Sequence, residues 1–232
     1  MEYKPEIKNG FNKILSNRPN AQKMVKSLEN QSELLLFGGS IRDYMDNKFN
    51  EVPRDFDIVL SNSTLNVLKN IQAIKCSVRS NKFGGYKVLV DDLVFDFWHL
   101  EDTWAFKKKI VPFNNISDLN KTVFLNIDAA FYNLNNECFY EKEFLDGLNN
   151  KILDIILTEN PFPDLNLARA FILKYKYDMK LSKRLSLYFI NWINDQKNDS
   201  EALNRLRSLE MKRYKTSIVN WSYEYESVKS LC

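Results

Sequence analysis

Helical spacing of apolar residues dominates the first 33 positions. Phe11, Ile14 and Leu15 fall on one side of a helix, and Asn20 is placed to cap a second helix over residues 21–30. Each segment has one apolar side, so both are expected to pack against a core formed by later parts of the chain.

From residue 34 the apolar residues come in short runs that are typical of buried strands. The segment YKVLVDDLVFDFWHL has two alternating apolar runs around Asp91 and Asp92, which is the pattern of a β-hairpin. We expect strands at 34–37 and 56–60, helices at 40–47 and 63–74, and the hairpin at 86–100. Elements in this order predict a small mixed sheet with helices packed on one side.

Past residue 120 the spacing becomes mainly helical. One helical stripe contains Leu167, Phe171, Ile172, Tyr175 and Met179. Pro161 and Pro163 mark the clearest break, so we expect a sheet-bearing domain over 1–157 and a helical domain over 158–232 that completes a cleft. The predicted fold class is α+β, with the mixed sheet followed by a mainly helical part.

The composition narrows the chemistry. His99 is the only histidine, and the three cysteines Cys76, Cys138 and Cys232 are scattered. The chain therefore lacks the residues for a zinc site with several imidazoles, for Ser-His-Asp hydrolysis and for a closed set of disulfides. No stretch approaches the roughly 20 apolar residues of a membrane helix, and the polar first residues lack a secretion signal, so a cytoplasmic protein without membrane contact is expected.

Positive charge is concentrated in the C-terminal third. Between Arg169 and Lys215 there are twelve Lys or Arg residues against five Asp or Glu, whereas the whole chain has a net charge of only +3. Such a surface suits a polyanion such as RNA or a triphosphate, and ordinary solvated helix faces would give the same pattern.

Three acidic residues interrupt the predicted strands. Asp55 and Asp57 would project side by side, about 6 to 7 Å apart along the backbone. Asp96 lies in the second hairpin strand between Phe95 and Phe97. If these strands are neighbours, the three carboxylates converge, and a hard divalent ion would relieve their repulsion. The alternative is that they lie on sheet edges or pair with Lys and Arg.

The stretch FGGS follows the first strand and opens a helix. Gly38 and Gly39 allow close backbone approach, and Ser40 with Asp43 resembles a capping box, so a phosphate fits at this helix start. A second stretch, FGGY at 83–86, lacks the ending of a phosphate-binding P-loop and predicts a turn.

These residues resemble the polymerase-beta-like nucleotidyltransferases, and among them the head domain of bacterial poly(A) polymerases and CCA-adding enzymes. That family carries a Gly-Gly-x-Val-Arg-Asp stretch that leads into an Asp-x-Asp strand. The matching residues here are Gly38, Gly39, Ser40, Ile41, Arg42, Asp43, Asp55, Phe56 and Asp57. Looser likeness continues to about residue 180, and it gives Asp96 the role of the family's third carboxylate.

The resemblance implies an enzyme that moves a nucleoside monophosphate from a nucleoside triphosphate, such as ATP, to an acceptor hydroxyl. The acceptor would be an RNA 3' end, as in tRNA processing, bound by the basic C-terminal helices. Asp55, Asp57 and Asp96 would be catalytic and would bind Mg²⁺ or Mn²⁺, with Asp96 helping to deprotonate the acceptor. The nucleotide-binding residues would be Gly38, Gly39, Ser40, Arg42, Asp43 and Arg169. A structural pairing of Arg42 with Asp43 or a carbonyl, and a merely exposed Arg169, are the alternatives.

The sequence also departs from the family pattern. Two arginines expected in segment 118–134 are absent, with only Lys121 nearby, and Asp164 is followed three residues later by Leu167 instead of an arginine. Two alternatives therefore stay open. One is a transferase that modifies a protein or a small molecule, and the other is a catalytically silent module that binds nucleotide or RNA.

Overall fold

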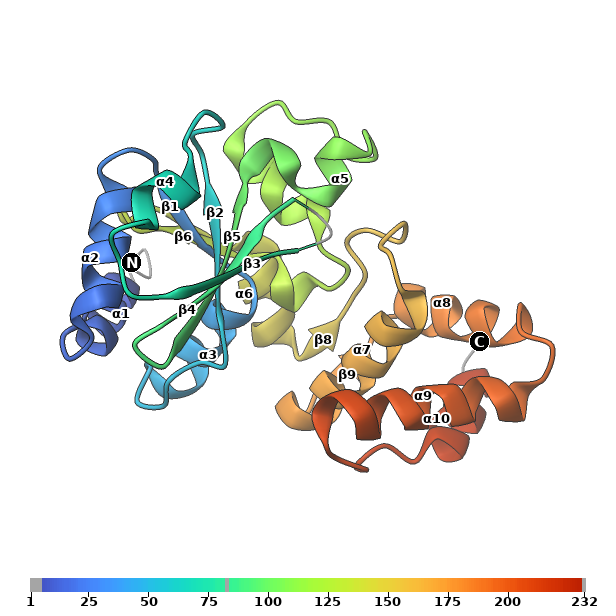
Figure 1. Cartoon of the computed structure of the whole chain (residues 1–232). Helices are drawn as coiled ribbons and strands as arrows, with labels where there is room; N and C mark the ends of the chain where they lie inside the picture. The colour runs from blue at the N-terminus through green and yellow to red at the C-terminus, as the bar shows by residue number, and fades with distance from the viewer. Residues whose placement is uncertain (1–5, 82–83, 231–232) are drawn as a thin grey trace. The chain divides into compact units, whose positions relative to one another are not determined.

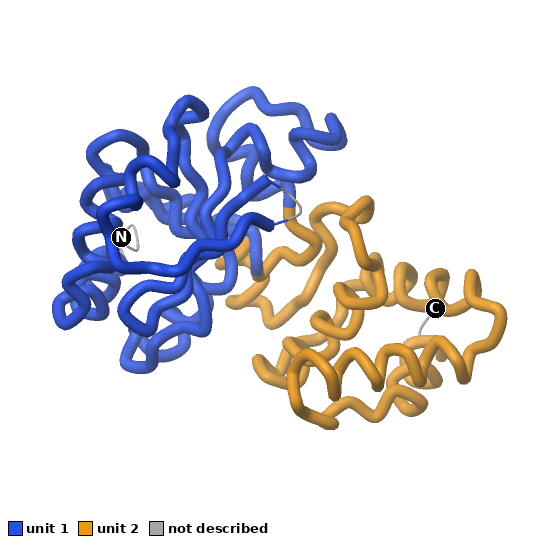
Figure 2. The backbone as a smooth tube through the Cα atoms, viewed as in Figure 1, with its two compact units in different colours: residues 1–122, 128–142 blue, residues 123–127, 143–232 orange. Residues whose placement is uncertain are grey.

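The computed structural model describes residues 6–81 and 84–230. The chain divides into two compact units, one of residues 1–122 and 128–142 and the other of residues 123–127 and 143–232 (Figure 2). The domain boundary that the sequence suggests near residue 157 stays a prediction.

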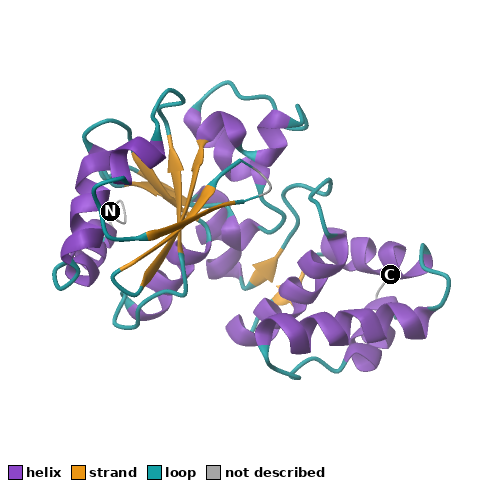
Figure 3. Cartoon of the chain, viewed as in Figure 1, coloured by secondary structure: helices purple, strands orange, loops and turns teal. Residues whose placement is uncertain are grey.

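The first unit is built on a seven-stranded mixed sheet (Figure 3). Its strands in chain order are β1 (Leu34–Phe37), β2 (Phe56–Leu60), β3 (Ser77–Ser80), β4 (Tyr86–Val90), β5 (Leu93–His99), β6 (Phe131–Asn133) and β7 (Phe139–Tyr140). They lie in the order β3-β4-β5-β2-β1-β6-β7. Within this sheet β2 and β5 are parallel and the other described pairs are antiparallel. This arrangement confirms the predicted α+β class and the hairpin.

One face of this sheet is covered by N-terminal helices. The helices of the first unit are α1 (Ile7–Leu15), α2 (Pro19–Glu29), α3 (Gly39–Asn47), α4 (Val67–Ile71) and α5 (Trp104–Lys107). Phe56 of β2 packs edge-on against Phe11 of α1, with ring centroids 5.1 Å apart, and stacks on Phe95 of β5 at 5.3 Å. Both strand residues are fully buried. The alternate positions of β2 and β5, which carry the acidic residues, therefore face the other side of the sheet.

The β4–β5 hairpin holds the start of α2. Asp91 and Asp92 form its tight turn with φ of 47° and 73°. The carboxylate of Asp91 accepts hydrogen bonds from the backbone N–H groups of Asn20 (2.6 Å) and Ala21 (3.0 Å), and Arg18 donates to Asp92 at 2.7 Å. The predicted capping role of Asn20 is therefore wrong, because the acceptor at this helix start comes from the hairpin.

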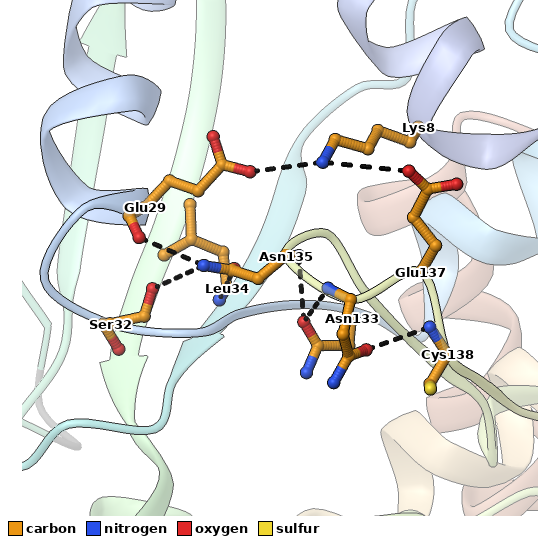
Figure 4. A network of polar contacts seen from close by, with 9 residues as sticks. Lys8, Glu29, Ser32, Leu34, Asn133, Asn135, Glu137 and Cys138 are labelled. Carbon is orange, nitrogen blue, oxygen red and sulfur yellow. Dashed lines mark hydrogen bonds and ion pairs between the residues drawn. The ribbon is translucent and has the colours of Figure 1, made fainter.

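A second polar network fixes the beginning of β1 (Figure 4). The side-chain oxygen of Asn135 accepts from the backbone N–H of Leu34 (2.9 Å), and its amide nitrogen donates to the carbonyls of Glu29 (3.0 Å) and Ser32 (3.3 Å). The turn between β6 and β7 is thereby tied to the end of α2. Asn135 thus holds both ends of the α2–β1 connection, and this fixes the position of β1, the strand that leads to Gly38.

The second unit is mainly helical (Figure 1). It contains α6 (Lys142–Asn150), α7 (Pro163–Tyr177), α8 (Lys183–Asn194), α9 (Asp199–Tyr214) and α10 (Trp221–Lys229), with a short parallel pair β8 (Ile152–Leu153) and β9 (Lys180–Leu181). Phe171 of α7 packs against Phe189 and Trp221 at 4.6 and 5.1 Å between ring centroids. The mainly helical structure expected past residue 120 is confirmed, and the short strands β6 and β7, which the helical spacing did not indicate, extend the first sheet. In the described part of the chain, every helix is too short or too polar to cross a lipid bilayer.

Candidate active site

Two of the three predicted carboxylates are direct neighbours in the sheet. Asp57 of β2 pairs with Asp96 of β5 in the parallel register, and Phe37, the last residue of β1, pairs with Asp57 on its other side. Neighbouring strands lie about 4.8 Å apart, and residues directly opposite one another share a face. Gly38 follows Phe37, so the carboxylates and the glycine turn meet at the same end of the sheet.

The third carboxylate, Asp55, lies two residues before Asp57 and immediately before β2, and it is half-buried. Its oxygens contact the guanidinium of Arg54 at 3.0 Å, and those of Asp96 contact Lys87 Nζ at 2.5 Å. Over residues 6–81 and 84–230, no three His, Cys, Asp or Glu side chains gather closely enough to hold a metal ion. The sheet register thus makes Asp57 and Asp96 neighbours, while Arg54 contacts Asp55 and Lys87 contacts Asp96.

The glycine turn has a conformation that requires glycine. Gly38 has φ +62° and ψ −115° and is the N-cap of α3, and its N–H donates to the carbonyl of Ala130 at 3.0 Å. The first turn of a helix leaves backbone N–H groups without intrahelical acceptors, and such groups bind anions. This turn therefore presents the backbone chemistry that a phosphate needs, beside the acidic strand ends.

Ser40 differs from its expected capping role. It lies inside α3, is only 1% exposed, and its hydroxyl donates to the backbone carbonyl of Asp55 at 3.2 Å. The helix begins two residues earlier than the capping-box pattern predicts, because Gly38 can adopt the left-handed φ that closes the turn. Ser40 instead ties the first turn of α3 to the residue that opens the acidic strand.

Replacing Gly38 by Ala is expected to destabilise the first unit by about 1–3 kcal/mol, because a residue with a Cβ is strained at this φ and ψ. A Cβ at Gly38 would meet no atom within 4 Å, so the loss reports backbone strain alone. Gly39→Ala is the matched control, since its Cβ would make an ordinary contact with Arg42 Nη2 at 3.5 Å. The stability losses of the two variants are measured by urea titration, with amide hydrogen exchange of the sheet as the readout. Equal losses in Gly38→Ala and Gly39→Ala would show that the conformation of Gly38 does not require glycine.

Arg42 is a buried ion-pair partner. Its side chain is only 10% exposed and its Nη1 contacts Asp128, whose side chain is equally buried. The structural pairing expected for Arg42 thus exists, but its partner is Asp128 and lies 86 residues away. Asp43 follows on α3 and is half-buried. The predicted roles of Arg42 and Asp43 in nucleotide binding stay predictions.

Lys121 is the basic residue nearest to the place where two arginines are expected, and it forms an ion pair within its own loop. Its ammonium donates to Asp118 at 2.7 Å, and the backbone N–H groups of Asn114 and Asn115 donate to the same carboxylate. These hydrogen bonds lower the pKa of Asp118 to about 2. Asp118 therefore stays ionised far into the acid range and holds this loop in place.

The remaining predicted site residue, Arg169, lies in the second unit on α7, where it is half-buried. On the same helix Asp164 forms an ion pair with Arg205 of α9, at 2.5 Å. The arginine that pairs with Asp164 therefore comes from another helix, because the position three residues after Asp164 is Leu167. Sequence reasoning missed three ion-pair partners: Asp128 for Arg42, Lys87 for Asp96 and Arg205 for Asp164. Of these, only Lys87 had a local signal, because it alternates with the buried Val88 along a strand.

The chain is similar to known proteins in its structure. No protein-family model matches the chain, and no curated protein matches it. A solved CCA-adding enzyme in an apo form matches over 94% of this chain and 53% of its own, with TM-score 0.62 and 14% identity. A tRNA nucleotidyltransferase complexed with a primer tRNA and an incoming ATP analogue matches over 90% and 58%, with TM-score 0.61 and 15% identity.

A third structure, a tRNA-processing enzyme in an apo form, matches over 88% of this chain and 54% of its own, with TM-score 0.62 and 16% identity. The chain spans about half the length of these solved structures. At this identity the likeness establishes the fold, and it confirms the resemblance that the Gly-Gly and Asp-x-Asp blocks indicate. The chain therefore has the fold shared by CCA-adding enzymes and tRNA nucleotidyltransferases.

Proposed function

We propose that this chain is a nucleotidyltransferase that transfers a nucleoside monophosphate from a nucleoside triphosphate to an RNA 3' hydroxyl. The observation that carries the proposal is the register Phe37–Asp57–Asp96, which sets two carboxylates beside the Gly38 turn. The acceptor oxygen would bond to the α-phosphorus, the bond from that phosphorus to the β-phosphate oxygen would break, and pyrophosphate would leave. Asp96 would accept the proton of the acceptor hydroxyl.

The residues present suit Mg²⁺ or Mn²⁺ by their chemistry. Asp55, Asp57 and Asp96 supply only carboxylate oxygens, the ligands that hard divalent ions favour. Asp57 and Asp96 share one sheet face, so the proposed ion would bind between these two, and binding would have to draw Asp55 closer than it lies among the described residues. Bound there, the ions would neutralise the triphosphate and favour departure of pyrophosphate. The backbone N–H groups at the start of α3 would orient the phosphates, and the buried sheet beneath would hold the strand ends rigid.

The proposed RNA surface lies on α9. From its middle to the residue after its end, this helix exposes the cations Arg205, Arg207, Lys212, Arg213 and Lys215, of which Arg205 forms an ion pair with Asp164. Glu210, the one acidic residue between them, is fully buried. Exposed cations in this number attract a phosphate backbone without reading its sequence. Arg169 on α7 is proposed to bind the nucleotide, and a cytoplasmic location is proposed because transfer to tRNA-like acceptors would take place there.

A catalytically silent module that binds nucleotide or RNA is the second candidate. The contacts of Lys87 with Asp96 and of Arg54 with Asp55 favour it, because these cations neutralise the carboxylates without a metal. The absence of two arginines from segment 118–134 favours it as well.

A labelling experiment separates these functions. The full chain is incubated with each α-labelled nucleoside triphosphate, Mg²⁺ or Mn²⁺ and total RNA, alongside Asp57→Asn and a charge-matched control, Asp46→Asn, on the exposed side of α3. We expect label in RNA with the parent and Asp46→Asn, and none with Asp57→Asn. Label on protein or a small molecule would redirect the proposal to another acceptor. Nucleotide binding without transfer of label to any fraction would overturn the enzymatic function.

A further inference from the structure

A row of charged residues crosses four strands of the sheet. The register pairs Arg79 of β3 with Lys87 of β4, Lys87 with Asp96 of β5, and Asp96 with Asp57 of β2. Residues directly opposite one another lie on the same face of a sheet. Two cations therefore continue the line of the two proposed metal ligands.

Lys87 makes the closest contact in this row. Its Nζ lies 2.5 Å from Oδ2 of Asp96, whose side chain is 17% exposed, while the lysine side chain is 48% exposed. The strand pairing fixes both backbones, so the ammonium is tethered next to this carboxylate. An ammonium donates hydrogen bonds to the same oxygen that a divalent ion would coordinate. It also reduces the repulsion between Asp57 and Asp96.

We propose that Lys87 is a tethered occupant of the carboxylate centre, which divalent ions must displace from Asp96. This inference rests on the proposed function of Asp57 and Asp96 as metal ligands. The ammonium lowers the affinity for free metal, because it competes for the same oxygen and repels a second cation. A nucleoside triphosphate supplies further oxygen ligands for the ion and an acceptor for the displaced ammonium. The metal therefore enters with the nucleotide, and Lys87 then contacts the phosphates.

The test measures Mn²⁺ binding to the full chain by electron paramagnetic resonance, which needs no turnover. Without nucleotide, Lys87→Met is expected to bind Mn²⁺ about tenfold more tightly than the parent, since one positive charge next to the ion is lost. With a non-hydrolysable triphosphate present, the same variant is expected to bind the Mn²⁺–nucleotide complex more weakly. Tighter binding without the nucleotide and weaker binding with it are effects of opposite sign. A general change of charge would not produce both, whereas displacement of Lys87 by the ion followed by its contact with the phosphates would.

Two control variants sharpen the test. Arg79→Met removes the same charge from the same row but one strand farther from Asp96, so its Mn²⁺ affinity is expected to change less than twofold. Lys87→Arg keeps the charge and is expected to resemble the parent. Methionine retains the length of the lysine stem, and far-ultraviolet circular dichroism checks that the sheet is intact.

The possible failures are distinguishable. Equal Mn²⁺ affinities of the parent and Lys87→Met, with binding abolished in Asp57→Asn, would overturn the role of Lys87 and leave the proposed function standing. An equal gain in Arg79→Met would also overturn it. Absence of Mn²⁺ binding in the parent and in Lys87→Met, with or without the triphosphate, would remove the metal centre and with it the proposed function.

Discussion

Replacing Asp128 by Ala is expected to lower the free energy of unfolding of the first unit by about 3–5 kcal/mol, because it leaves the Arg42 guanidinium buried without its carboxylate. Both side chains are only 10% exposed, so water cannot replace the lost partner. The measurement is a urea titration followed by amide hydrogen exchange of β1, β2 and α3. This loss would exceed that of a typical surface substitution severalfold.

The double variant Arg42→Met with Asp128→Leu serves as the control. Replacing both members of a buried ion pair by apolar residues is close to neutral, so most of the lost stability is expected to return. Lys23→Ala on the exposed side of α2 is expected to change stability by less than about 0.5 kcal/mol. A loss below about 1 kcal/mol in Asp128→Ala would show that the pair does not hold α3 in place.

The ion pair matters for the candidate site because of where Arg42 lies. Arg42 is one helical turn after Gly39, and its Nη2 would be 3.5 Å from a Cβ added there. A guanidinium has five N–H donors in one plane, so contact of Nη1 with Asp128 fixes the direction of the others. Asp128 therefore helps to set the geometry of the first turn of α3, the turn proposed to bind phosphate.

The parts of this site that the sequence predicts depend on local patterns. The alternation in FDIVL and LVFDF places Asp57 and Asp96 on strands, and the Gly-Gly pair predicts a turn that begins a helix. Each of these signals lies within a few residues. The structure confirms the hairpin and the mixed sheet, and the pairing of β2 with β5 is the one long-range feature that the sequence could only suggest.

The parts that sequence reasoning missed depend on partners far along the chain. Arg42 and Asp128 are 86 residues apart, and Arg18 reaches Asp92 across 74 residues. No local spacing indicates such pairs, because the sequence pattern around a charged residue is the same whether its side chain is solvated or forms an ion pair. The strands β6 and β7 are three and two residues long, too short for a periodic pattern to distinguish them from a loop.

A buried acid also organises the second unit. Glu210 of α9 is fully buried, and its carboxylate accepts hydrogen bonds from the backbone N–H groups of Ile218 (2.6 Å) and Val219 (3.1 Å). The indole N–H of Trp221 donates to its other oxygen at 2.9 Å. One side chain therefore satisfies three donors in the connection between α9 and α10. Its burial also keeps this negative charge off the exposed surface of α9.

Replacing Glu210 by Ala is expected to lower the free energy of unfolding of the second unit by about 3–5 kcal/mol, because three donors, two of them in buried hydrogen bonds, lose their acceptor at once. Glu210→Gln is expected to lose about 1–3 kcal/mol, since an amide oxygen can still accept the two backbone N–H groups while its NH₂ opposes the Trp221 N–H. Amide hydrogen exchange of α9 and α10 in urea measures both losses. The control Glu201→Ala, exposed on the same helix, is expected to stay within about 0.5 kcal/mol of the parent. Equal losses in the Gln and Ala variants would mean that the negative charge, and not the number of satisfied donors, holds the two helices together.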